Sequence, residues 1–214
     1  MDFQQLKQQF EAHRSPDALP MAKYMKNRFS FLGIKTPQRR KITNPLFKGQ
    51  KELDWDFVKQ CWQADEREYQ YAACDYLLRL KKRLTLADLS KIKKLVLNKS
   101  WWDTVDNLAK LITTLYLQYP PEISQEMLAW SQADNFWLRR CAIDFQLLLK
   151  EKTDTQLLKT ILENNLPDDE FFINKAIGWA LRDYSKTNPQ WVKNFIQTHS
   201  QLSPLSVREG SKYL

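Results

Sequence analysis

Residues 135–142 read Asn-Phe-Trp-Leu-Arg-Arg-Cys-Ala, and a related stretch one repeat later decides the fold of this chain. Residues 170–177 read Glu-Phe-Phe-Ile-Asn-Lys-Ala-Ile, so both stretches give an aromatic pair, an aliphatic residue, a polar residue, a base and then small residues. Residues 100–102, Ser-Trp-Trp, keep the aromatic pair in the preceding unit. Successive aromatics lie 33, 35 and 35 residues apart, at Tyr69, Trp102, Trp137 and Phe172.

A period of this length with two helices per unit indicates an α-solenoid of HEAT-like helical repeats with a concave face. Apolar spacing is helical nearly throughout, with helices expected to open at Asp2, Asp17, Thr36, Asp54 and Asp65. Further helices are expected over residues 85–97, 100–119, 121–132, 135–150, 153–164, 168–186, 188–198 and 203–214. Within the aromatic pairs, Trp101, Phe136 and Phe171 are expected to pack inward.

Composition supports an all-α protein, because four glycines among 214 residues are too few for the turns of an all-β protein. We expect a single domain over residues 1–214, since no linker or low-complexity segment divides the chain. No apolar run has the length of a membrane span, and the N-terminus lacks a signal-peptide core. The expectation is a monomeric cytoplasmic protein without membrane contact.

Cysteine and histidine usage gives no support for a metal or a cofactor. The three cysteines, Cys61, Cys74 and Cys141, are far apart, and the only histidines are His13 and His199. Structural zinc and Cys-His catalysis are therefore poorly supported, and buried thiols in a reducing compartment are expected.

The formal net charge of +8 comes from 33 basic and 25 acidic residues. The basic residues recur in short patches along the chain. One such patch is most often only a solvated face, but one concave basic surface that gathers several would suit a polyanion such as DNA.

Trp102 and Asp106 are four residues apart and therefore share one helix face. An indole beside a carboxylate suits a cationic ligand, whereas the surrounding bases suit a polyanion. DNA that carries a cationic alkylated purine satisfies both demands. A recurring aromatic is more often core than ligand-binding, so packing remains the alternative for Trp102.

Four segments together resemble the AlkD family of DNA alkylation repair enzymes, which are built from HEAT-like repeats. The resemblance runs from the first helix almost to the end in matching order. It is carried by residues 21–27 with 31–34, by residues 100–106, by residues 137–140, and by residues 175–179 with 187–189.

The resemblance implies a monofunctional DNA glycosylase that removes cationic N3- and N7-alkylated purines, such as 3-methyladenine and 7-methylguanine, from double-stranded DNA. Asp106 matches the catalytic carboxylate, and Trp102 and Trp179 match the tryptophans that line the lesion site. Arg140 matches a phosphate-binding arginine, and Tyr24 lies on the helix that approaches the minor groove. The further DNA contacts expected are Lys26, Lys35, Arg39, Lys175 and Arg182, although Lys35 stands where the family has glutamine.

This reaction needs few groups, because the lesion's own charge replaces the general acid of ordinary glycoside hydrolysis. A single carboxylate is expected to stabilise the oxocarbenium ion and to position water. Two alternatives stay open: a catalytically silent paralogue that binds damaged or branched DNA, and a helical-repeat scaffold for protein interactions.

Overall fold

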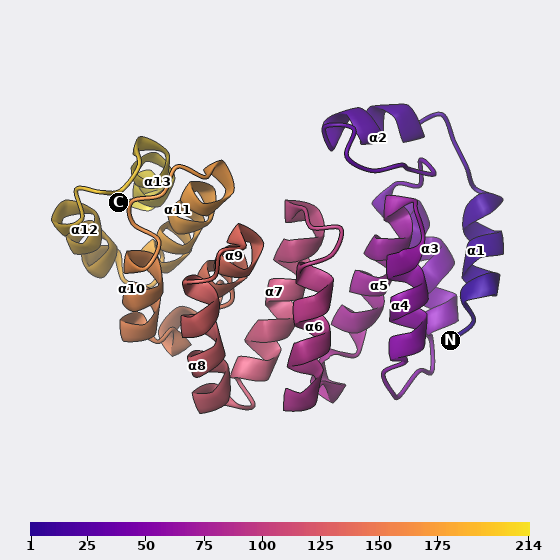
Figure 1. Ribbon diagram of the computed structural model, residues 1–214, viewed down its shortest axis with the longest axis horizontal. Coiled ribbons are helices and arrows are strands. Elements are labelled where there is room, and N and C mark those ends of the chain that lie inside the picture. The colour runs from indigo at the N-terminus through magenta and orange to yellow at the C-terminus, as the bar shows by residue number, and fades with distance from the viewer. The chain divides into compact units, whose positions relative to one another are not determined.

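The computed structural model describes residues 1–214 as thirteen α-helices without a β-strand, which confirms the all-α repeat fold (Figure 1). Short 3₁₀ turns join some of them. The helices are α1 (Phe3–Glu11), α2 (Ala18–Tyr24), α3 (Thr36–Phe47), α4 (Trp55–Gln63), α5 (Arg67–Arg79), α6 (Leu89–Val96), α7 (Trp102–Tyr116), α8 (Pro120–Ser131), α9 (Phe136–Asp144), α10 (Thr155–Glu163), α11 (Phe171–Ser185), α12 (Pro189–Thr198) and α13 (Pro204–Gly210).

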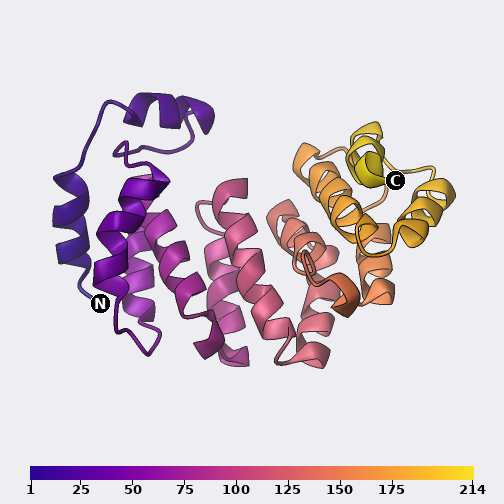
Figure 2. The same cartoon turned by 180° about the vertical axis from the view of Figure 1, so that it is seen from behind.

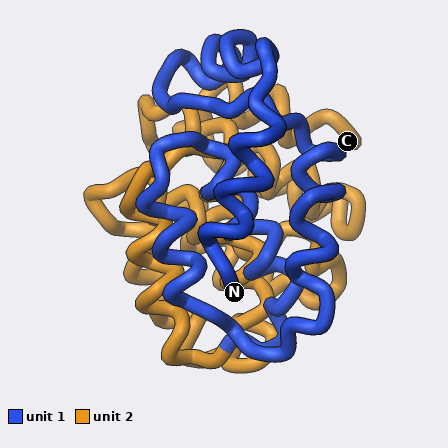
Figure 3. The backbone as a smooth tube through the Cα atoms, turned by 90° about the vertical axis from the view of Figure 1, so that its right-hand side faces the viewer, with its two compact units in different colours: residues 1–84 blue, residues 85–214 orange.

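The chain divides into two compact units, Met1–Leu84 and Thr85–Leu214, coloured separately in Figure 3. The single domain expected over residues 1–214 stays a prediction, and each unit is described by itself.

In the first unit, α1 packs on α3 and α4, and α4 packs on α5. Phe47, Phe57 and Tyr76 form its aromatic core, with ring centroids 5.3–6.0 Å apart in edge-on geometry. The buried carboxylate of Glu68 accepts hydrogen bonds from the backbone N–H groups of residues 32–34 at 2.8–3.0 Å. This contact satisfies amides that would otherwise be buried without a partner, and it fixes the segment that follows α2.

The second unit consists of two rows of helices. In one row α7 packs on α9, α9 on α11 and α11 on α13; the other row contains α6, α8 and α10 (Figures 1 and 2). The apolar faces between the rows form the core, which includes Leu108, Ile112, Met127, Ile143 and Ile177.

Several hydrogen bonds of the second unit span one repeat length and tie each repeat to the next. Thr113 Oγ1 donates to the carbonyl of Phe145, 32 residues further on, and Asn165 Nδ2 donates to the carbonyl of Ser131, 34 residues back. Ser206 Oγ donates to the carbonyl of Asn174 at 2.9 Å, again across 32 residues. These ties have the spacing of the repeats recognised in the sequence.

The aromatic pairs pack differently from one repeat to the next. Trp101 is buried as predicted, but Phe136 is only partly buried and Phe171 is 56% exposed, so the inward assignment of these two was wrong. The reason is a shift of one residue: α7 begins at the second aromatic of its pair, whereas α9 and α11 begin at the first. In α9 the second aromatic, Trp137, is therefore the buried one.

Most helix starts agree with the sequence. The side chains of Asp2, Asp54, Asn188 and Ser203 cap the helices that follow them. Thr36 is instead the first residue of α3. Two helices end earlier than expected: α2, expected to end near Gly33, ends at Tyr24, and α9, expected to extend to residue 150, ends at Asp144.

Candidate functional site

Three charged residues occupy the same position in successive repeats of the second unit. Asp106, Arg140 and Lys175 are each the fifth residue of their helices, α7, α9 and α11. Because these helices pack side by side, charges at this position become neighbours.

Asp106 and Arg140 form a bidentate ion pair. Arg140 Nε donates to Asp106 Oδ1 at 2.8 Å and Nη2 donates to Oδ2 at 3.1 Å, while Nη1 donates to the carbonyl of Phe172 at 2.7 Å. The Arg140 side chain is 2% exposed and that of Asp106 is 22% exposed. The carboxylate therefore has a fixed orientation, and it keeps unoccupied lone pairs that can face solvent.

This pairing gives Arg140 a role that the sequence did not predict. Its guanidinium is buried, and three of its N–H groups donate to protein oxygens, so that it holds Asp106 in place. Its contact with a DNA phosphate stays a prediction. Burial opposes its charge, but Asp144 and Asp106 outweigh burial and raise the pKa of Arg140.

A second carboxylate, Asp144, lies against the same arginine and was missed in the sequence. Its Oδ2 lies 3.5 Å from Arg140 Nε, and neither of its oxygens has a hydrogen-bond partner. Burial raises the pKa of Asp144 to about 7; Arg140 opposes this shift and Asp106 adds to it.

A pocket of about 310 Å³ opens beside these groups. One stripe of α7, one stripe of α11 and the end of α9 line it, because residues three and four apart share a helix face. Its lining comprises Asp106, Ala109, Lys110, Thr113, Asp144, Leu147, Leu148, Trp179, Arg182, Asp183 and Lys186.

Trp179 is the aromatic wall of this pocket. The guanidinium of Arg140 lies 5.3 Å from its ring centroid and that of Arg182 lies 5.9 Å away, so the indole contacts two cations. The ring is partly buried and is held by these contacts. The sequence-predicted residues Asp106, Arg140, Trp179 and Arg182 thus meet at one place.

Trp102 lies one turn from Asp106 on the same face of α7 and is partly buried, but it does not line this pocket. It is the first residue of α7, whereas the residues of that helix that line the pocket lie between Asp106 and Thr113.

Lys175 and Arg182 share one acidic partner, Glu209 of α13. Lys175 Nζ lies 2.8 Å from Oε1 and Arg182 Nη1 lies 2.9 Å from Oε2. The hydrogen bond from Lys175 lowers the pKa of Glu209 despite some desolvation. Both predicted DNA contacts therefore sit beside a carboxylate that the sequence did not reveal.

The other predicted DNA contacts belong to the first unit. Tyr24 is 71% exposed at the end of α2, and Lys26 follows in the left-handed region at φ 60°. Lys35 pairs with Asp17 at 2.8 Å on the surface. Arg39 is buried, with its Nε 3.0 Å from Asp75 Oδ2 and its guanidinium over Tyr71, and its contact with DNA stays a prediction.

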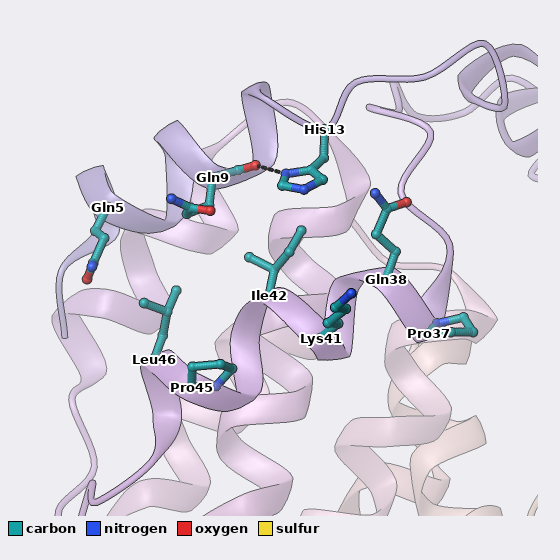
Figure 4. Close-up of a pocket in the computed structure, with 9 residues that line it drawn as sticks. All are labelled: Gln5, Gln9, His13, Pro37, Gln38, Lys41, Ile42, Pro45 and Leu46. Atoms are coloured by element: carbon teal, nitrogen blue, oxygen red, sulfur yellow. Dashed lines mark hydrogen bonds between the residues drawn. The ribbon is translucent and has the colours of Figure 1, made fainter.

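A second cavity, of about 670 Å³, lies between α1 and α3 of the first unit (Figure 4). Gln5, Gln9 and His13 project from one face of α1 toward Lys41 and Ile42, and Nδ1 of His13 lies 2.7 Å from the carbonyl of Gln9. None of the predicted site residues lines it, and no carboxylate does. The pocket beside Asp106 is therefore the candidate site.

All three cysteines are buried, and burial raises the pKa of Cys141 well above its usual range. No group of three or more His, Cys, Asp or Glu side chains is placed to hold a metal ion. None of the helices is both long enough and apolar enough to cross a membrane.

Comparison with known proteins places this architecture in a family. Residues 6–214 match the family model described as DNA alkylation repair enzyme. A solved structure from Enterococcus faecalis, described as a predicted DNA alkylation repair enzyme, is 40% identical and superposes with a TM-score of 0.89, covering 94% of this chain and 97% of that one.

The structure of smu.31 from Streptococcus mutans UA159 is 17% identical, with a TM-score of 0.62, and covers 83% of this chain and 92% of that one, so it shows the fold alone. A search of curated proteins found no match. The family model, which spans nearly the whole chain, together with the close structural relative, shows that this protein belongs to the DNA alkylation repair enzyme family and has a role in DNA repair.

Proposed function

We propose that this protein is a monofunctional DNA glycosylase that hydrolyses the N-glycosidic bond of N3- and N7-alkylated purines in double-stranded DNA. The observation that carries the proposal is the oriented Asp106 carboxylate, which shares one pocket with the indole of Trp179. Membership in a DNA alkylation repair family supports DNA as the substrate.

The chemistry requires one carboxylate because an alkylated purine is already a cation. The C1′–N bond breaks with its electron pair moving to the base, which leaves as a neutral alkylpurine. Positive charge develops on the deoxyribose, where Asp106 stabilises it, as a carboxylate does in ordinary glycosidases. Water adds its oxygen to C1′ and releases one proton, which leaves an abasic site.

Trp179 supports this reaction as a surface for the cationic nucleotide. A desolvated cation–π contact contributes about 1–2 kcal/mol, which corresponds to roughly tenfold in affinity. Arg182 and Lys175 would contribute phosphate contacts from the same helix, α11. In the first unit, Tyr24 would approach the minor groove, and Lys26 and Lys35 would be further DNA contacts. We include Trp102 as a second aromatic contact on the face of α7 that carries Asp106.

The test is base release from a duplex that contains 7-methylguanine, followed by chromatography of the free base. The Asp106→Asn variant should lower release about 100-fold or more, as loss of a transition-state contact does, while duplex binding persists. The matched control is Asp134→Asn, the same chemical change at an exposed position. No release by the wild-type protein at saturating binding would overturn the proposal.

One observation favours a second candidate, a silent module that binds damaged DNA. The bidentate pair with Arg140 neutralises the charge of Asp106, as a purely structural ion pair would. This candidate predicts wild-type binding without base release, and a binding curve that Asp106→Asn leaves unchanged.

A further inference from the structure

Asp144 is a buried carboxylate that its surroundings satisfy only in part, through the charge of Arg140. Its side chain is 2% exposed, and both oxygens lack a hydrogen-bond partner. Burying a carboxylate in this way is costly, and such groups in native structures call for an explanation. Asp144 nevertheless stands on the wall of the pocket that contains Asp106 and Trp179.

Arg140 makes its hydrogen bonds without Asp144. Its guanidinium already donates two hydrogen bonds to Asp106 and a third to the carbonyl of Phe172. Asp144 approaches the same guanidinium only at 3.5 Å, outside good hydrogen-bond geometry. What Asp144 adds is therefore charge.

The charge balance explains why that addition matters. Asp106 at −1 and Arg140 at +1 sum to zero, so the pair alone has little attraction for a cation. Ionised Asp144 brings the sum to −1. In a partly desolvated pocket, one unit of charge has a large effect on a cationic ligand.

We propose that Asp144 is a positioning residue that balances the charge of Arg140, so that the charge of Asp106 remains available to a cationic sugar or base in the pocket. This inference rests on the proposed function, since it assigns the same pocket a cationic ligand. It assigns Asp144 no contact with the reacting atoms.

A dependence on pH follows from the burial of Asp144. Burial raises the pKa of this carboxyl to about 7, so the cluster of Asp106, Arg140 and Asp144 gains its net negative charge as the pH rises through neutrality. A bound cation favours the ionised form, so it should expel the proton of Asp144 near pH 7.

Other titratable groups face this region from each packed helix. The charged ones are Asp106 and Lys110 of α7, Arg140 of α9, and Arg182, Asp183 and Lys186 of α11, and the thiol of Cys141 on α9 is neutral. Comparison with an Asp144 variant separates their effects from that of Asp144.

The experiment compares two stable abasic-site duplexes, one with a cationic pyrrolidine and one with a neutral tetrahydrofuran. Dissociation constants are measured by fluorescence anisotropy between pH 6 and pH 8.5. For the wild-type protein, the preference for pyrrolidine should grow about tenfold over this range. Asp144→Asn, which resembles the protonated acid in shape, should show a small preference that does not change with pH. An unchanged pH-dependent preference in Asp144→Asn overturns the inference.

Wild-type calorimetry provides a second measurement that does not depend on the folding of any variant. In two buffers of different ionisation enthalpy at pH 7, the pyrrolidine duplex should release more protons than the tetrahydrofuran duplex, and equal release overturns the inference. Neither readout requires catalysis. If the protein releases base but cation binding is not coupled to proton release, only the role of Asp144 is refuted. If cation binding is coupled to proton release but no base is released, the glycosylase is refuted and a cation-selective DNA-binding site remains.

Discussion

Gly178 of α11 lies directly against Glu209 of α13. A Cβ atom at position 178 would stand 2.5 Å from Cβ of Glu209 and 3.3 Å from the carbonyl oxygen of Ser206. A glycine inside a helix permits the close approach of another segment, and here the approaching segment is α13. The same contact brings Glu209 to Lys175 and Arg182.

Gly178→Ala should destabilise the protein by about 1–3 kcal/mol, because the added methyl group has to separate α11 from α13. Urea unfolding measures this change. The loss should be smaller in a Glu209→Gly background, where the opposing Cβ is absent, since residues in contact do not contribute additively. Equal losses in the two backgrounds would show that the cost does not come from contact with the side chain of Glu209.

Glu209→Gln should strengthen binding to undamaged duplex at low salt. The change removes the carboxylate that occupies Lys175 and Arg182, and each cation that then meets a phosphate steepens the salt dependence by about 0.9 in log–log slope. Anisotropy titrations at several salt concentrations check this. Glu122→Gln, at an exposed position on α8, makes the same charge change and should leave the slope unaltered.

Asp144→Asn should make the protein more stable than the wild type at pH 8. The difference in the free energy of unfolding between variant and wild type should be smaller near pH 4. The folded protein holds a proton on Asp144 up to about pH 7, whereas the unfolded chain loses that proton near pH 4. Wild-type stability therefore falls as pH rises from about 4 to 7, by up to roughly 4 kcal/mol for three pKa units, and the variant lacks this loss. Thermal unfolding across this range is the measurement, and parallel curves would contradict the assignment.

Arg140→Met should cost about 3–5 kcal/mol, because it leaves two carboxylates near one another without a counter-charge. Chemical denaturation measures the loss. Adding Asp144→Leu should recover part of it by removing one of the unbalanced charges. A single variant as stable as the wild type would mean that the ion pair is solvated rather than buried.

The repeat fold was accessible to sequence reasoning because its signals are local. Helix caps such as Asp2 and Asn188, and the aromatic period, need only neighbouring residues to be recognised. The end of α9 could not be predicted from the sequence. Residues 145–150 contain no glycine or proline, and the helix stops where Gln146 exchanges hydrogen bonds with the backbone of Asp154 and Leu148 enters the left-handed region at φ 67°.

The site was predicted in part. Asp106 was proposed from its spacing to Trp102 and Trp179 from a family resemblance, and both line one pocket. The partner of Asp106 could not be read from local pattern, because Arg140 is 34 residues away. Asp144 did leave a signal: an aspartate inside the apolar run Ala142-Ile143-Asp144-Phe145, four residues after an arginine, is a candidate for a buried ion pair.

The hydrogen bonds that reach across one repeat length have a consequence for how activity is lost on heating. Asp106, Arg140 and Trp179 belong to three successive repeats, so the pocket exists only while those repeats remain stacked. Stacked repeats are stabilised chiefly by their immediate neighbours, and terminal ones open first. Detachment of the last helices would therefore dismantle the pocket while most of the chain is still helical, and inactivation should precede the main loss of circular dichroism signal.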